Sequence, residues 1–463
     1  MTLGFGNFVG NARRILRIGR RVAARPREFL AKAELYINRA EAEPAFLQYR
    51  NGLPSIAPLT LAVDPVLSAR PVLNVLLPGM SMRAMSGGPN TAINLVYRMA
   101  HQGVPVRFIS TDIPMDQDHG PLRRHFATLT GLPADCPNVE ICCGFDRSVP
   151  LLIGENDVFF ASAWWNVQMI KKALELTRPK RFLYIIQDFE PGLYPWSTEY
   201  ALALETYSLD YHAFLCGNFL ADYMVKQEIG KFAKPGFIDE CAIFEPAIDA
   251  TKFYPDPAAQ ADRPRRLVFY ARPTIAKRNL FELGLYALRC AAMTGVFSGE
   301  TWELLFIGEQ VPSVDLGNGI TIRSAPWLGF DDYAKLLRGS DIALSLMLSP
   351  HTSYPPVEMA ACGGIAVTNV FANKTEAALA AVSPNIIAVA PTLECVIGGL
   401  REAVARVRDG RSYRGAIGLP PNWDATFADT VPRALRMYRD IQVAFGVETG
   451  DETASVLTAA GSR

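Results

Sequence analysis

Short apolar runs alternate with stretches of helical spacing through most of the chain, and this alternation restricts the fold more than any other feature. The first unit has an apolar run at 72–77, a glycine-containing loop, a helical pattern at 91–101 and a second apolar run at 104–109. A strand, a helix and another strand in this order form the building block of a parallel sheet. The alternation continues to residue 244.

A second series of the same kind begins at 267–271, after a polar, proline-rich stretch at 255–266. Its later apolar runs lie near 302–307, 320–323, 342–348, 365–368 and 386–389. The sequence therefore predicts an α/β protein with two Rossmann-like parallel-sheet domains that face each other across a cleft. Ligands of such sheets bind outside the carboxyl ends of the strands, so we expect the site in that cleft.

We divide the chain into an arm at 1–65, two sheet domains at 66–250 and 251–430, and a final helix with a polar tail at 431–463. The arm is basic, and its first part carries Arg13, Arg14, Arg17, Arg20, Arg21, Arg25 and Arg27 among apolar residues. This pattern could form an amphipathic helix on an anionic membrane surface. A solvated or packed arm is the alternative explanation.

Composition excludes several classes of function. Lys+Arg and Asp+Glu both number 46 in the 463 residues, and a nucleic-acid-binding protein would usually carry a basic excess. The eight cysteines and five histidines show no spacing typical of a metal site, so we expect no bound metal and no other cofactor. Scattered reduced cysteines and the lack of a long apolar run indicate a cytoplasmic protein, at the inner face of the membrane if the arm binds lipid.

Gly87 and Gly88 form the first candidate site, in the loop after the first strand. Glycines there let backbone N–H groups approach a ligand closely, and the start of the following helix favours an anion. An ordinary tight turn is the alternative explanation.

Three cations follow the first strand of the second series: Arg272, Lys277 and Arg278. Cations at a strand end suit a diphosphate, because Arg can bind phosphate oxygens with two donors and Lys acts as a point charge. The alternative is a solvated helix start, which is disfavoured because cations there oppose the helix dipole.

The segment 349–364 follows another strand and contains His351, Ser353, Tyr354 and Glu358. A proline-rich loop that leads into a short helix would fix Glu358 where its carboxylate could accept hydrogen bonds from a sugar or ribose hydroxyl. Glu358 could instead be an acidic residue that stabilises a helix start, and His351 could be a loop histidine with ordinary partners.

Asp188 and Glu190 lie in an aromatic segment at the end of a strand in the first series. Two carboxylates beside aromatic rings could bind the hydroxyls of a second substrate, and one of them could act as a base. Capping and turn formation are the competing explanations.

Taken together, these motifs resemble GT-B, family-4-like glycosyltransferases. The glycine loop, the segment 246–255, the Arg272–Lys277 pair and Glu358 match the family's glycine loop, interdomain segment, diphosphate-binding cations and second signature glutamate. The strings QDFEPGLYP, ARPTIAKRNLFELG and SPHTSYPPVEMAACGG resemble the WsaF-type rhamnosyltransferases more closely, within a similarity that spans roughly 74–374.

The resemblance implies transfer of L-rhamnose from dTDP-β-L-rhamnose to a glycan, or a lipid-linked glycan, of the bacterial surface. It implies that the first sheet domain is the acceptor side and the second the nucleotide-sugar side. Arg272 and Lys277 would hold the diphosphate and Glu358 would meet the nucleoside sugar. His351, Ser353 and Tyr354 would lie beside the diphosphate or the transferred sugar.

One departure keeps alternatives open. Pro350 stands where the family has its first signature glutamate, so no carboxylate is available there to orient the donor. A non-catalytic nucleotide- or glycan-binding subunit therefore remains an alternative, as does a GT-B nucleotide-sugar epimerase or a sugar phosphorylase. The acceptor, the linkage, the anomeric outcome and the oligomeric state stay open.

Overall fold

The computed structural model describes residues 56–85, 87–260, 263–273, 277–410 and 415–446. All the elements discussed below belong to one compact unit, Pro58–Arg463. The basic arm predicted at 1–65 lies almost entirely outside the described residues, as does the polar tail after residue 446.

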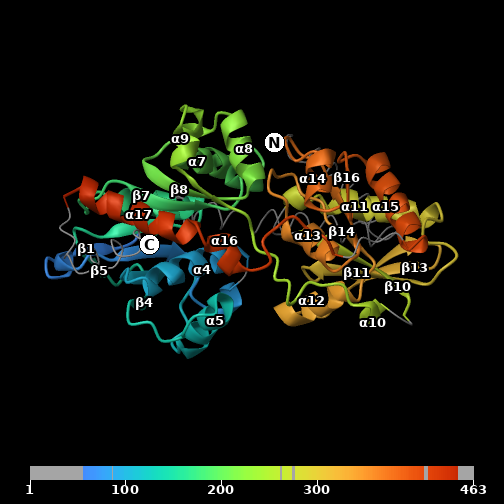
Figure 1. Cartoon of the computed structure of the whole chain (residues 1–463), viewed down its shortest axis with the longest axis horizontal. Coiled ribbons are helices and arrows are strands. Elements are labelled where there is room, and N and C mark those ends of the chain that lie inside the picture. Colours follow the sequence, from blue (N-terminus) through green and yellow to red (C-terminus); the bar gives the residue numbers. More distant parts are fainter. Residues whose placement is uncertain (1–55, 86, 261–262, 274–276, 411–414, 447–463) are drawn as a thin grey trace, which may run out of the picture. The chain divides into compact units, whose positions relative to one another are not determined.

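The described residues form two seven-stranded sheets and one two-stranded sheet (Figure 1). The first large sheet has the order β4-β3-β2-β6-β7-β8-β9, and every neighbouring pair in it is parallel. Its strands are β2 (Leu73–Leu77), β3 (Val106–Ser110), β4 (Val139–Cys143), β6 (Val158–Ala161), β7 (Phe182–Ile186), β8 (Tyr211–Cys216) and β9 (Ala242–Phe244). The short strands β1 (Leu61–Val63) and β5 (Leu151–Ile153) pair separately.

This N-terminal sheet is buried on both faces. Leu73, Val75 and Leu77 of β2 belong to one hydrophobic core, whereas Leu76 belongs to another, as the two-residue period of a strand requires. The helices of this part are α4 (Gly87–His101), α5 (Gly120–Thr130), α6 (Trp164–Ala173), α7 (Thr198–Thr206), α8 (Asn218–Lys226) and α9 (Phe237–Glu240).

The second large sheet has the order β12-β13-β11-β10-β14-β15-β16, and its edge strand β12 is antiparallel to β13. Its strands are β10 (Arg265–Ala271), β11 (Trp302–Gly308), β12 (Val314–Gly317), β13 (Ile320–Ser324), β14 (Ile342–Leu344), β15 (Ile365–Asn369) and β16 (Ile386–Val389). Its helices are α10 (Pro257–Gln260), α11 (Phe281–Met293), α12 (Phe330–Arg338), α13 (Tyr354–Ala361), α14 (Glu376–Val382) and α15 (Leu393–Arg408). The predicted α/β class with two parallel-sheet domains is confirmed.

Each sheet contains one point at which the strand order reverses. The chain runs outward from β2 to β4 and then returns to place β6 beside β2. In the second sheet it runs outward from β10 to β13 and then returns to place β14 beside β10. Ligands of open α/β sheets bind outside the carboxyl ends of the strands at such switch points. We therefore expect ligands at the ends of β2 and β6 and at the ends of β10 and β14.

The end of the chain returns to the N-terminal sheet. The helical stretch expected at 427–445 is divided into α16 (Trp423–Phe427) and α17 (Thr430–Ala444). Figure 1 shows α17, in red, beside β7 and α4, and its apolar residues share the core of β2. The Tyr438 hydroxyl also donates a hydrogen bond to the Pro71 carbonyl at 3.4 Å.

Two element boundaries differ from the sequence prediction for local reasons. The strand predicted at 342–348 ends at Leu344, because the Asn369 side chain bonds both the N–H and the carbonyl of Met347 and so replaces strand partners there. The first helix begins at Gly87 and not near residue 91, because Pro89 is tolerated in a first helical turn. Helix α5 and strand β4 were not predicted.

Gly308, at the end of β11 and beside Arg272, occupies a position that only glycine fits without strain. Its φ is +108°, and an added Cβ would lie 2.7 Å from the Ala271 carbonyl oxygen. We expect Gly308→Ala to lower the free energy of unfolding by about 1–3 kcal/mol, as measured by urea unfolding. The control is Gly398→Ala, where an added Cβ meets nothing within 4 Å and the helix should gain about 0.5–1 kcal/mol. Equal effects of the two substitutions would contradict the constraint.

Candidate functional site

The loops after β10 and β14 are joined at the switch point of the second sheet. The first carries Arg272 and the turn Lys277–Asn279, and the second runs from residue 345 to the start of α13. The Leu348 N–H donates to the Arg278 carbonyl at 2.9 Å, and the Asn279 side chain donates to the Leu346 carbonyl at 3.1 Å. Two segments singled out from the sequence therefore lie in contact at one switch point.

The three cations of this site have different surroundings. The Arg272 guanidinium is half-buried and donates to the Tyr270 hydroxyl at 3.4 Å. The Lys277 side chain is 69% exposed, and its ammonium lies 3.5 Å from Glu282. Arg278 is mostly buried, and its Nε is a buried donor without a partner among the described residues. Arg272 and Lys277 are therefore accessible to a ligand from solvent, whereas Arg278 is held inside the protein.

Asp188 fixes Arg278 from the other sheet. It follows β7, and its carboxylate forms an ion pair with the Arg278 guanidinium and accepts a hydrogen bond from the Ser349 hydroxyl. The two charged side chains are only 13% and 16% exposed. Burial alone would raise the pKa of Asp188, but Arg278, His351 and Ser349 together hold that pKa below its ordinary value. One carboxylate thus joins the N-terminal sheet to both loops of the second sheet.

His351 is a buried, neutral histidine that shapes the start of α13. Burial lowers its pKa to about 4. Its Nδ1 accepts a hydrogen bond from the Ser353 N–H at 3.0 Å, which leaves the proton of the neutral ring on Nε2, 3.7 Å from the Cys216 sulfur. Ser353 has a φ of +68°, which non-glycine residues rarely adopt. His351 therefore stabilises the turn into the helix.

Lys374 is a functional candidate that the sequence analysis did not identify. Its side chain is fully buried, and its ammonium donates to the carbonyls of Met347 and His351 at 3.1 and 3.4 Å. Burial lowers its pKa to about 8. No sequence pattern marks this position, because a lysine that follows a strand is ordinarily exposed.

Glu358 is also buried, and Tyr354 is partly buried. The Tyr333 hydroxyl of α12 donates to the Glu358 carboxylate at 2.6 Å, and burial raises the pKa of Glu358 to about 7. Tyr354 is the first residue of α13, and its ring lies 6.0 Å from the His351 ring. Both side chains belong to α13, which directly follows the loop that Asp188 binds through Ser349.

Glu190 lies in the core of the N-terminal sheet. Its carboxyl accepts a hydrogen bond from the Tyr184 hydroxyl at 2.8 Å, and its N–H donates to the Tyr207 hydroxyl at 3.1 Å. Burial raises the pKa of Glu190 to about 8. Both Asp188 and Glu190 are 9% exposed. Their carboxyl groups bind other residues of the protein and are not open to solvent. Their roles toward a second substrate stay predictions.

Gly87 and Gly88 form the first turn of α4, at the switch point of the N-terminal sheet. Gly87 is exposed, and the Gln187 side chain after β7 donates to the Gly88 carbonyl at 3.0 Å. An added Cβ at Gly88 would lie 3.3 Å from Gln187, so a small residue is favoured there. The glycines were predicted in the loop ahead of the helix but lie within its first turn, and their role toward an anion stays a prediction.

Two kinds of feature, a metal-ligand cluster and a membrane-spanning helix, are absent from the described part of the chain. Within it, no group of three or more His, Cys, Asp or Glu side chains is placed to hold a metal ion. None of its helices is long and apolar enough to cross a membrane. The expected independence from metal stays a prediction.

Comparisons with known proteins agree on the two sheet domains. Residues 72–215 match the family model described as "WsaF, N-terminal domain", and residues 265–401 match "WsaF, C-terminal domain". The chain is also 33% identical over 304 residues to the O-antigen biosynthesis protein RfbC of Myxococcus xanthus. That match covers 61% of this chain and 22% of RfbC, so the chain spans about a fifth of that protein.

Solved structures of low sequence identity share the fold. Anabaena Alr3699/HepE, determined in complex with UDP and glucose, has a TM-score of 0.52 at 11% identity and covers 81% of this chain and all of its own. The same protein with UDP-glucose also has a TM-score of 0.52, at 12% identity. These similarities establish the GT-B arrangement of two Rossmann-like domains.

The Asp188–Arg278 contact gives the first prediction for the site. Removal of one partner of a buried ion pair typically costs about 3–5 kcal/mol, because the other charge is left buried and unpaired. We expect Asp188→Asn and Arg278→Gln each to lower the free energy of unfolding. The double variant should lower it by at least about 1.5 kcal/mol less than the sum of the two single effects. Urea unfolding of the four proteins measures this coupling.

The matched control is the exposed pair of Arg181 and Asp210, whose side chains are 37% and 48% exposed. Its coupling should stay below about 1 kcal/mol. A coupling between Asp188 and Arg278 no larger than the control would show that the buried pair does not join the sheets.

Glu190 gives a pH-dependent prediction. A carboxyl whose pKa rises from 4.5 to about 8 on folding binds its proton more tightly in the folded state. Its contribution to stability is complete below pH 4.5 and is lost as the pH rises toward 8, with a slope of up to about 1.4 kcal/mol per pH unit. We expect Glu190→Gln to remove this fall in the free energy of unfolding between pH 5 and 8. An unchanged slope in the variant would mean that Glu190 is ionised in the folded protein.

Proposed function

Because the chain belongs to the WsaF family of GT-B glycosyltransferases, we propose that it transfers L-rhamnose from dTDP-β-L-rhamnose to a hydroxyl group of a bacterial surface glycan. The membership confirms the resemblance drawn from the sequence. Glycosyl transfer follows from the family, whereas the sugar, the base and the acceptor are the proposed part. The relative named for O-antigen biosynthesis supports a surface glycan as the acceptor.

The observation that supports this function best is the meeting of the cationic segment with the start of α13 at the switch point between β10 and β14. A nucleoside diphosphate needs cations for its phosphates, and a helix N-terminus favours negative charge. Arg272 and Lys277 supply the cations, and Tyr354 begins the helix.

The reaction breaks the bond between the sugar and the diphosphate, and negative charge develops on the leaving oxygen. Fixed cations beside that oxygen stabilise the charge, so the proposal requires no metal. The buried Nε of Arg278 is an unsatisfied donor among the described residues, which costs about 1–3 kcal/mol. The donor-binding role of Arg278 stays a prediction, because this nitrogen is buried and a phosphate oxygen would have to enter the contact with Asp188 to reach it.

Glu358 is proposed to accept hydrogen bonds from the nucleoside sugar. It lies in α13, and Tyr333 holds its carboxylate from the side of α12. With Pro350 in place of the family's first glutamate, Glu358 is the carboxylate of this segment that remains for the donor. His351 and Ser353 are proposed to shape the loop around the diphosphate and the transferred sugar.

The acceptor is proposed to approach from the N-terminal sheet, where Gly87 and Gly88 begin α4. We place the reaction in the cytoplasm, at the inner face of the membrane if the basic arm binds anionic lipid. That arm lies outside the described residues.

The cation hypothesis is tested with the double variant Arg272→Ala, Lys277→Ala. Loss of one donor that stabilises developing charge commonly lowers kcat by about 100- to 1,000-fold, so at least that loss is expected. Release of dTDP from dTDP-β-L-rhamnose is the measurement, with UDP- and GDP-sugars assayed in parallel. Arg289→Ala, on the exposed face of α11, is the matched control and should retain full activity.

Retention of activity in the double variant would remove the proposed role of the two cations. Release of UDP or GDP in place of dTDP would overturn the donor assignment and leave sugar transfer intact. A protein that releases no nucleotide from any sugar would favour the non-catalytic subunit.

A further inference from the structure

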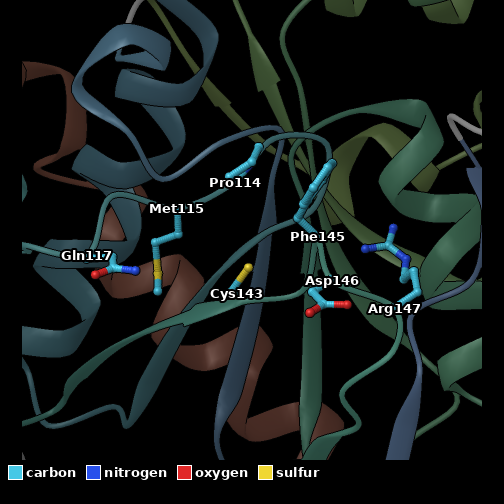
Figure 2. A pocket seen from close by; sticks show the side chains of 7 residues that line it. All are labelled: Pro114, Met115, Gln117, Cys143, Phe145, Asp146 and Arg147. Carbon is cyan, nitrogen blue, oxygen red and sulfur yellow. The ribbon is translucent and has the colours of Figure 1, made fainter.

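A hollow lies at the carboxyl ends of β3 and β4, beside the switch point of the N-terminal sheet. Its volume is about 560 Å³, within the range of roughly 300–1,000 Å³ that is usual for sites of small molecules. Figure 2 shows Met115 and Gln117 on one side of the hollow and Phe145 and Asp146 on the other. Both sides are loops that directly follow strands.

The lining combines an apolar face with a polar edge. The Phe145 ring is 43% exposed and, with Pro114 and Met115, provides the apolar part. The exposed Gln117 amide and Asp146 carboxylate provide the polar part. A pyranose ring has one face of C–H groups that can stack on an aromatic ring and hydroxyls at its rim that need hydrogen-bonding partners. The hollow therefore fits a sugar unit.

Arg147 holds the two sides of the hollow together. Its guanidinium donates to the carbonyls of Gly144 and Thr111, and its Nε donates to the Pro58 carbonyl at 3.1 Å. These bonds join the loop after β4 to the loop after β3 without a ligand. A ligand that binds here would therefore lose little free energy to ordering of the site.

A line of hydrogen bonds runs from the hollow to the switch point. The Thr111 hydroxyl donates to the Asp112 carboxylate at 2.7 Å, and the Trp165 indole N–H donates to the same carboxylate at 2.9 Å. Trp165 lies in the first turn of α6, directly after β6. Because neighbouring strands lie about 4.8 Å apart, the hollow is about 5–10 Å from the end of β2. Asp112 is exposed, and its carboxylate can accept further hydrogen bonds from sugar hydroxyls, whereas the Trp165 N–H is already used by that carboxylate.

We propose that the hollow binds a sugar unit of the acceptor glycan one or two units away from the unit that receives the new sugar. The proposal rests on the proposed function, since it assumes a glycan acceptor. It makes the enzyme select acceptors by length, because a single sugar at the switch point leaves the hollow empty. Phe145 is the residue that provides the stacking surface.

The experiment compares methyl α-L-rhamnoside with the corresponding di- and trisaccharides of L-rhamnose as acceptors, at saturating dTDP-β-L-rhamnose. The wild-type protein should show a KM at least five times lower for the trisaccharide than for the monosaccharide. Phe145→Ala should raise the KM for the trisaccharide about 5- to 10-fold. The KM for the monosaccharide and the rate of donor hydrolysis in the absence of acceptor should not change. Gln117→Ala tests the polar side in the same way.

Tyr286→Ala is the matched control, because Tyr286 is 56% exposed on α11 of the other sheet domain. It should leave all these values unchanged. A wild-type protein without length selection, or a Phe145→Ala variant that keeps it, would overturn the proposal.

Failure of the proposed function gives a different result from failure of the hollow. If the wild-type protein does not hydrolyse dTDP-β-L-rhamnose, the donor assignment fails, and direct binding of the trisaccharide by saturation-transfer NMR still tests the hollow. Weaker trisaccharide binding by Phe145→Ala than by Tyr286→Ala supports the proposal, whereas equal binding or no binding to the wild-type protein overturns it.

Discussion

The ion pair between Asp188 and Arg278 is the contact on which the site depends. It joins a loop of the N-terminal sheet to the cationic loop of the second sheet, and Ser349 extends it to the loop before α13. A buried ion pair adds little stability by itself, but it tolerates only one arrangement because either charge alone would be costly to bury. The position of Arg278, and through its backbone that of Leu348, is therefore set by a residue on the opposite sheet.

Burial determines the charge state of most polar groups around this contact. His351 is neutral, and Glu190 keeps its proton near neutral pH, because no solvent compensates their charged forms. The buried Lys374 ammonium donates hydrogen bonds to carbonyls of the loop before α13. Two cations of the site remain accessible, Arg272 and Lys277, and these are the ones suited to a charged substrate.

The sequence predicted the fold well because its signals are local. The strands of both sheets are short apolar runs, and the helices between them show regular spacing, so the α/β class and the two series could be recognised. The return of the final helix to the N-terminal sheet depends on packing of residues such as Met437 into a core that β2 also lines, which no local pattern reveals. The early end of β14 depends in the same way on Asn369.

The site was predictable only in part. Arg272, Lys277, Arg278 and the segment 349–358 were identified because their residue types suit a diphosphate, and the structure joins their loops at one switch point. Asp188 was assigned to a second substrate because a carboxylate beside aromatic residues is typical of a sugar site, whereas its partner lies 90 residues away. Pairing at that separation, like the burial of Lys374, is fixed by tertiary structure and has no sequence signature.

The cations after β10 and the start of α13 are proposed to hold a nucleoside diphosphate together. A crystal structure of the protein with dTDP would show whether they do. We expect the diphosphate oxygens within hydrogen-bonding distance of the Arg272 guanidinium and the Lys277 ammonium, at the ends of β10 and β14. A nucleotide bound elsewhere, with both side chains turned toward solvent, would contradict it.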